Sequence, residues 1–217
     1  MSIDLTAYYR QAPLMQPGDI IAFCGPSTDP LSFLIKAWTG SRFTHTAMVQ
    51  RHQIVGGPDV VITESTIMKE AGKTINGVQS HSLAEVLIDE YSNPSDLAYH
   101  LALKPEYRAQ IDPIALDAYA SAMVGKVAYD VVGYLAFGLH DIPFIGAHLM
   151  QNESMKRAFC SAWCAEILDH FNVLRGVDFT HTNPWALIRM NLFSQWTQIL
   201  GKPTPIQQGW NSIGVAP

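Results

Sequence analysis

Cys160, His45 and Glu64 carry the three side chains that thiol-based nucleophilic catalysis requires. A thiol becomes a strong nucleophile once it loses its proton, so it needs a neighbouring base, and the base works best when a third group orients it. The imidazole of His45 would be that base, and the carboxylate of Glu64 would orient it. These residues lie far apart in the chain, so the predicted elements must explain how they meet.

Cys160 lies at the start of a segment with helical periodicity. Trp163 and Ile167 recur four residues apart on one face, and Ser161 suits the start of a helix. The sulfur of Cys160 would then lie at a helix N-terminus, where free N–H groups and the helix dipole lower the pKa of a thiol. The alternative is that Cys160 and Cys164 are both small buried core residues, as most free cysteines are.

His45 and Glu64 fall on two consecutive predicted strands. Residues 41–50 form a loop that enters a strand, and Glu64 interrupts the apolar strand 60–65. A carboxylate inside an apolar strand needs a partner or must face a cleft. If the two strands pair antiparallel, Glu64 can bond one nitrogen of His45 and leave the other for the thiol proton. Taken singly, His45 could be a strand-end histidine bonded to backbone, and Glu64 a carboxylate facing water.

The composition favours a globular protein and argues against nucleic acid as a main partner. Hydrophobic residues make up 48% and charged residues 15%, while the formal net charge is −5. The odd count of three cysteines indicates a reducing compartment. The N-terminus lacks the features of a signal peptide, and charge and proline interrupt the apolar stretch 131–150, so neither export nor a membrane span is expected. These features predict a cytoplasmic protein.

Predicted strands dominate the first half of the chain and predicted helices the second, which favours an α+β fold with an antiparallel sheet packed against helices. We expect one domain over residues 1–217, with an irregular N-terminal arm at 1–17 and a Pro- and Gly-rich tail at 201–217. Strands are predicted at 20–24, after 45, at 60–65, 77–80 and 96–103, and helices at 30–39, 82–89, 109–124, from 160 onward and from 184 to about 193.

Six motifs follow one another along the chain: Gly18-Asp19, Trp38-Thr39-Gly40-Ser41 followed by His45, Val61-Ile62-Thr63-Glu64, Gly125-Lys126-Val127-Ala128-Tyr129-Asp130, Phe159-Cys160-Ser161 and Thr182-Asn183-Pro184. In this order they resemble the YiiX/YaeF-like family, the circularly permuted branch of the NlpC/P60 papain-like cysteine hydrolases. That branch is distantly similar to lecithin:retinol acyltransferase. The resemblance runs from about residue 17 to residue 193.

The resemblance implies a permuted papain-like fold. Neither a cofactor nor a metal is expected. The resemblance also implies that Cys160 is the nucleophile, His45 the base and Glu64 the group that orients the base. Tyr129 is expected to line the substrate pocket or help bind the oxyanion, with a core tyrosine as the alternative. Ser161 is expected beside the substrate.

One departure from the family pattern leaves a second register open. The family often has Glu two residues after the cysteine, where this chain has Ala162. The later run Cys164-Ala165-Glu166 mimics the same motif. Cys164 is therefore an alternative nucleophile, although it lies one turn inside the helix, where the dipole acts less strongly.

The function predicted from these observations is a cysteine hydrolase, of the amidase or peptidase kind, that cleaves an amide or ester through an acyl-enzyme. Its substrate would be a small peptide, a cell-wall fragment, another amide or an acyl lipid. One alternative is a lipid acyltransferase or thioesterase that uses the same residues. A zinc site built from the three residues is another, without support from an HExxH or CxxC motif. A binding module without catalysis is the last, and the oligomeric state is left open.

Overall fold

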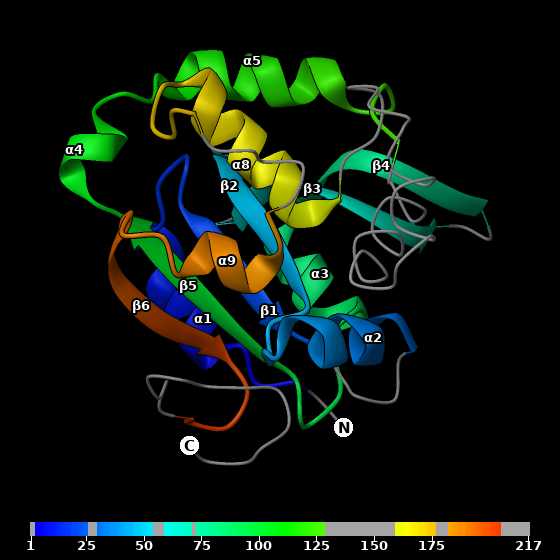
Figure 1. The fold of residues 1–217 in the computed structure, drawn as a ribbon. Helices are drawn as coiled ribbons and strands as arrows, with labels where there is room; N and C mark the ends of the chain where they lie inside the picture. The colour runs from blue at the N-terminus through cyan, green and yellow to red at the C-terminus, as the bar shows by residue number, and fades with distance from the viewer. Residues whose placement is uncertain are drawn as a thin grey trace.

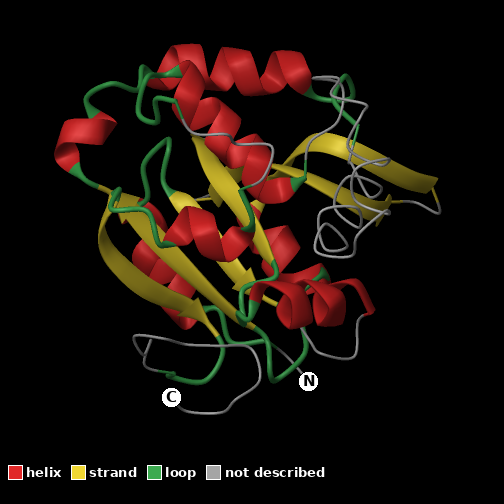
Figure 2. Ribbon diagram, viewed as in Figure 1, coloured by secondary structure: helices red, strands yellow, loops and turns green. Residues whose placement is uncertain are grey.

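The computed structural model of the chain describes residues 3–25, 30–53, 59–70, 73–128, 159–176 and 182–204. Six strands form one antiparallel sheet in the order β4-β3-β2-β1-β5-β6, with helices on both faces (Figure 1 and Figure 2). The α+β class predicted from the sequence is confirmed. The strands are β1 (Ile20–Cys24), β2 (His45–Gln53), β3 (Asp59–Glu70), β4 (Lys73–Ser82), β5 (Leu97–Leu103) and β6 (Phe193–Leu200). The helices are α1 (Thr6–Gln11), the 3-10 turn η1 (Ala12–Leu14), α2 (Pro30–Thr39), α3 (Leu83–Asp89), α4 (Pro105–Arg108), α5 (Pro113–Met123), α8 (Cys160–His170) and α9 (Pro184–Ile188).

Strand β1 lies inside the sheet and is buried on both faces. Its sequence is a run of five apolar residues without polar alternation, the pattern expected when helices cover both sides of a strand. Ile20 and Ala22 belong to the core shared with α8 and α9, whereas Ile21 and Phe23 belong to the core shared with α1 and α3. β1 pairs with β2 on one side and with β5 on the other.

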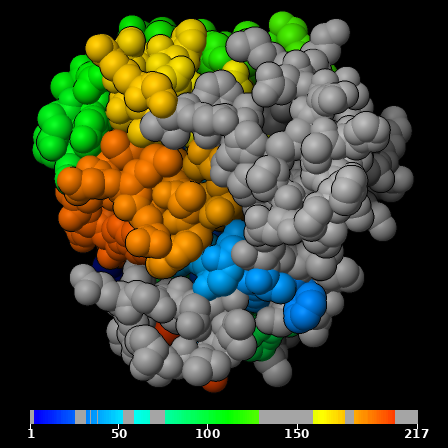
Figure 3. All heavy atoms as spheres, in the orientation of Figure 1, coloured from blue at the N-terminus to red at the C-terminus, as the bar shows by residue number. Residues whose placement is uncertain are grey.

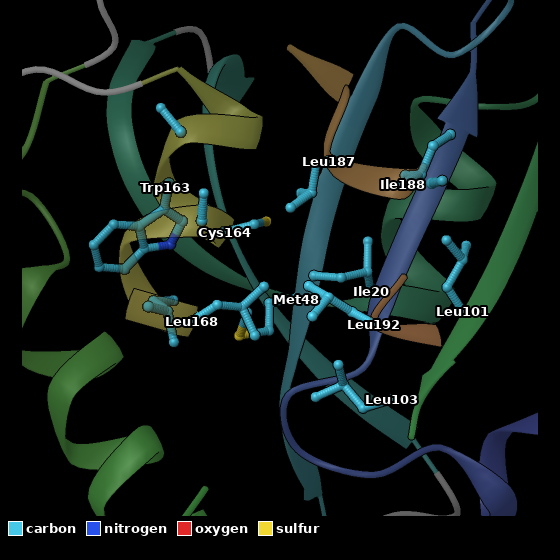
Figure 4. Packing of buried hydrophobic residues seen from close by; sticks show 14 of the residues in the cluster. Ile20, Met48, Leu101, Leu103, Trp163, Cys164, Leu168, Leu187, Ile188 and Leu192 are labelled. Atoms are coloured by element: carbon cyan, nitrogen blue, oxygen red, sulfur yellow. The ribbon is translucent and has the colours of Figure 1, made fainter. Parts of the chain in front are cut away.

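Helix α8 packs across β2 and β3. Trp163 is completely buried, and its indole Nε1 donates a hydrogen bond to Thr63 Oγ1 on β3 at 3.0 Å. Figure 4 shows Cys164 and Leu168 of α8 packed toward Met48 of β2. The bond from Trp163 fixes the helix along its axis, so the residue at the helix start is placed over the beginning of β2.

Asp19 of the Gly-Asp motif is a buried carboxylate with four donors around it. The backbone N–H groups of Gln16 and Leu103 donate to it at 2.8 Å each, and His100 Nε2 lies 2.8 Å away. The guanidinium of Arg108 completes the set as an ion pair. Charge-assisted bonds of this kind make a buried carboxylate tolerable, and here they join the start of β1 to β5 and α4.

We expect Asp19→Ala to lower the free energy of unfolding by about 3 kcal/mol, because it removes the carboxylate that pairs with a buried imidazole and a partly buried guanidinium. Urea denaturation followed by circular dichroism measures the effect. Asp89→Ala removes an exposed carboxylate at the end of α3 and should change stability by less than about 0.5 kcal/mol. Equal stability of the two variants would show that the buried network contributes nothing.

Two elements differ from the sequence-based expectations. The segment expected to be an irregular arm contains α1 and η1, in which Tyr8 is fully buried while Tyr9 is 53% exposed. The helix expected from 184 to about 193 ends at Ile188, and strand β6, which was not predicted, follows it along the edge of the sheet. The other predicted strands and helices are present, but the helix expected at 109–124 begins only at Pro113 as α5, and the short helix α4 before it was not predicted.

Two sequence predictions lie outside the described residues. These are the apolar stretch 131–150 and most of the C-terminal tail, from residue 205 onward. Within the described ranges, none of the helices has the length and apolar character needed to cross a membrane.

Candidate active site

Cys160 is the first residue of α8 and is almost completely buried. Burial raises the pKa of a thiol, but the positive charge of His45 and a hydrogen bond with its side chain act in the opposite direction. Backbone N–H groups of Thr46 and Ser161 also donate to the sulfur. Together these contacts outweigh burial and lower the pKa of Cys160 below the ordinary thiol value.

The register of the sheet explains why Thr46 can donate to this sulfur. The N–H of Val49 donates to the carbonyl of Asp19 in the β1–β2 ladder. The backbone N–H groups of alternate residues of β2 therefore point toward β1, and those of the residues between them point toward β3. Thr46 is among those facing β3. The β2–β3 ladder begins only at Met48, opposite Thr63. The N–H of Thr46 therefore lies beyond the ladder and is available to the thiolate.

His45 and Glu64 meet across β2 and β3. Because Thr63 is opposite Met48, Glu64 is a diagonal neighbour of His45 on the same face of the sheet. Nε2 of His45 contacts Oε2 of Glu64, and the two side chains are 13% and 3% exposed. The other ring nitrogen, Nδ1, is then left for the hydrogen bond with Cys160.

The protonated imidazole is strongly favoured in this position. Burial lowers the pKa of His45, but the negative charges of the Cys160 thiolate and of Glu64, with hydrogen bonds to both, raise it to about 10. A thiol with a lowered pKa beside an imidazole with a raised pKa forms a thiolate–imidazolium pair. Such a pair combines a nucleophile with a proton donor for the leaving group.

The other two cysteines lie in different environments. Cys164 is one turn further along α8 and fully buried, and burial with the nearby charge of Cys160 raises the pKa of its thiol. Burial raises the pKa of Cys24 on β1 to about 12. Both thiols remain protonated at neutral pH, so these environments favour the Cys160 register over the Cys164 register.

Ser161 and Tyr129 were the two residues expected beside the substrate, and the structure describes only the first of them. The hydroxyl of Ser161 is fully buried and donates to the carbonyl of Thr182. Asn183, next to Thr182, caps α9 by accepting from Ala186 N–H at 2.8 Å. The side chain of Ser161 thus ties the start of α8 to the turn before α9, and its backbone N–H faces the sulfur. Tyr129 lies outside the described residues.

Two aromatic residues lie beside the Cys160–His45–Glu64 site and were not predicted from the sequence, namely Phe23 and Tyr91. The ring of Phe23 lies 5.6 Å from that of His45, and the ring of Tyr91 stacks on Phe23 at 4.4 Å between centroids. Phe23 reads as one more apolar residue of a buried strand. Tyr91 belongs to no helix or strand, so only the tertiary structure shows that it lies near these three residues.

Figure 3 shows the surface on the side of α8, α9 and β6, with α9 and β6 in orange between the gold of α8 and the light blue of the segment that leads from α2 into β2.

In the part of the chain that the structure describes, no cluster of three or more His, Cys, Asp or Glu side chains is arranged to hold a metal ion.

Comparison with known proteins gives a fold relationship. No family model and no curated protein matches the sequence. Among solved structures, the chain is similar to the metalloprotein YiiX from Escherichia coli O157:H7, with a TM-score of 0.51 and 16% sequence identity. The similarity covers 87% of this chain and 98% of the YiiX chain. At this identity the likeness concerns the fold.

Proposed function

We propose that this protein is a cysteine hydrolase that cleaves an amide or ester bond through an acyl-enzyme on Cys160. The observation that supports the proposal most directly is the position of His45, bonded on one side to Glu64 and on the other to the thiol at the start of α8. Hydrogen-bonded contacts from nucleophile to base and from base to orienting carboxylate are the geometric signature of triad catalysis.

The proposed reaction has two halves. The Cys160 thiolate attacks the substrate carbonyl carbon, and backbone N–H groups at the start of α8 and β2 stabilise the negative charge that develops. The imidazolium of His45 then gives its proton to the leaving amine or alcohol, and the acyl group stays on sulfur. In the second half His45 takes a proton from water, which attacks the thioester and releases the acid.

A permuted papain-like fold belongs to this proposal. In papain-type enzymes the cysteine lies near the mature N-terminus and the histidine follows it in the chain. Here His45 and Glu64 precede Cys160, although the helix-borne cysteine and strand-borne histidine have the same roles. The motif resemblance and the extent of the YiiX likeness both support one such unit over most of the chain.

The reactivity of the three cysteines tests the thiolate–imidazolium pair without a known substrate. We expect iodoacetamide to alkylate Cys160 well below the pH at which an ordinary thiol, with a pKa of about 8.5, reacts. Cys24 and Cys164 serve as controls in the same molecule, and mass spectrometry of peptides separates the three. His45→Ala should remove the advantage of Cys160, because the cation that lowers its pKa is gone.

Two results would contradict the assignment. If Cys164 reacts first, the nucleophile lies one helical turn further on. If Cys160 has no advantage over the other two thiols, the site has no activated nucleophile.

The YiiX structure is described as that of a metalloprotein, and a thiol–imidazole pair also binds soft metal ions, so the alkylation is run with and without a chelator. Protection that disappears with the chelator would favour a metal site instead.

A further inference from the structure

The rings of Tyr91, Phe23 and His45 lie in a row that ends at the candidate site. Phe23 is directly opposite His45 in the β1–β2 register, and their ring planes are tilted by 39° at 5.6 Å. On Phe23 the ring of Tyr91 stacks with an interplanar angle of 17° at 4.4 Å. Phe23 has no exposed surface, so its ring cannot turn unless a neighbour gives way. The orientation of the His45 imidazole is thus coupled through Phe23 to the position of Tyr91.

Tyr91 reaches this row from outside the sheet. It follows the end of α3 and packs, partly buried, against the core that contains Phe23. Burial, and then the negative charges of Glu64 and Cys160, raise the pKa of its hydroxyl well above the ordinary value. The phenol is therefore neutral over the pH range in which the thiolate–imidazolium pair exists, and its contribution beside Phe23 is a flat, uncharged ring.

We propose that Tyr91 is a positioning residue for His45, acting through the ring of Phe23. By holding Phe23 in place, Tyr91 keeps the imidazole in the orientation that meets Glu64 on one side and Cys160 on the other. The inference rests on the proposed hydrolase function for its catalytic meaning. The positioning itself is tested on His45 and needs no substrate.

The groups that face His45 explain what a loss of the ring would change. Among the described residues, the charges that act on His45 are Glu64 from β3 and Cys160 from α8, and Phe23 of β1 is uncharged. The aromatic ring of Phe23, tilted against the imidazole at 5.6 Å, stabilises the cation and holds its orientation, and an imidazole that is held less firmly loses part of its alignment with both charges. Removing the Tyr91 ring should therefore make the protonated form of His45 less stable and lower its pKa, while every charge stays in place.

The experiment compares Tyr91→Leu, which keeps an apolar side chain without a ring, with Tyr91→Phe, which keeps the ring. The titration of His45 is followed by NMR of protein with ¹³C-labelled histidine, and the His45→Gln spectrum assigns its signal among the eight histidines. We expect Tyr91→Leu to lower the pKa of His45 by about half a unit to one unit, and to slow Cys160 alkylation at pH 6 by about 3- to 10-fold. Tyr91→Phe should match the wild type in both.

Tyr9→Leu is the matched control, because Tyr9 is also a tyrosine that pairs with another ring, but its partner is Tyr8, at 5.1 Å, and not Phe23. It should leave His45 unchanged. The proposal is overturned if Tyr91→Leu does not move the pKa of His45, or if Tyr91→Phe moves it equally, since the hydroxyl and not the ring would then be responsible. Tyr91→Met is the second ring-free variant if the leucine variant does not fold.

The two proposals fail in different ways. If the pKa of His45 responds to Tyr91→Leu but no amide or ester is cleaved, the hydrolase function is wrong and the positioning stands. If substrates are cleaved and the pKa of His45 is the same in both Tyr91 variants, the function stands and the positioning role is wrong.

Discussion

Cys160→Ala is expected to reduce the cleavage of an activated acyl ester, such as p-nitrophenyl acetate, by at least about 10³-fold. Loss of the nucleophile removes the covalent route altogether, and in enzymes of this type only binding and oxyanion stabilisation then remain. The fold should survive, because alanine is a good helix former and Cys160 sits at the first position of α8. Release of p-nitrophenol under single-turnover conditions, with intact mass to detect the acyl group, measures the effect.

Cys164→Ala is the control for this experiment. It removes a buried thiol from the same helix, one turn away, without touching His45 or Glu64. We expect it to keep turnover within a few-fold of the wild type, while some stability is lost from the core. An acyl adduct that persists in Cys160→Ala and disappears in Cys164→Ala would place the nucleophile at Cys164.

Local sequence patterns predicted the elements that carry Cys160, His45 and Glu64. The periodicity after Cys160 indicates α8, and the apolar strands around His45 and Glu64 indicate β2 and β3, because each of these signals depends on neighbours in the chain. Antiparallel pairing of the two strands was a condition of the prediction, and the structure shows it. The contact between the imidazole and the carboxylate follows from that register.

The missed features depend on contacts between distant segments. Strand β6 lies at the edge of the sheet, and its residues do not alternate cleanly between buried and exposed, so its sequence carries no period-two signal. The N–H of Thr46 is available only because the β2–β3 ladder stops at Met48, and no residue type signals where a ladder stops. Tyr91 depends on where the chain runs after α3. Such features follow from tertiary structure rather than local propensity.

Glu64→Gln is expected to lower the turnover of the same ester by about 10²- to 10⁴-fold, while the thiol is still present. The amide has nearly the size of the carboxylate but no charge, and it can donate a hydrogen bond to Nε2 of His45 in place of accepting one. A ring held in the wrong tautomer no longer offers its other nitrogen correctly to Cys160. The carboxylate charge also helps to raise the pKa of His45 to about 10.

The pH profile of the reaction separates this effect from a general loss of structure. The active form needs Cys160 deprotonated and His45 protonated, so activity rises with pH through the lowered thiol pKa and falls again near the raised imidazole pKa of about 10. Without the Glu64 charge the imidazole loses its proton at lower pH, so the alkaline limb should move to lower pH. The profile of kcat/KM against pH for the free enzyme measures both limbs.

Glu166→Gln provides a matched carboxylate on α8. Glu166 is also partly buried and accepts a hydrogen bond, at 3.0 Å from the hydroxyl of Tyr119, but it belongs to the alternative Cys164 motif. We expect this variant to keep both limbs of the wild-type profile. If Glu166→Gln shifts the alkaline limb and Glu64→Gln does not, the third member of the site has been assigned to the wrong carboxylate, since of these two carboxylates the one that faces His45 should set the pH at which the imidazole loses its proton.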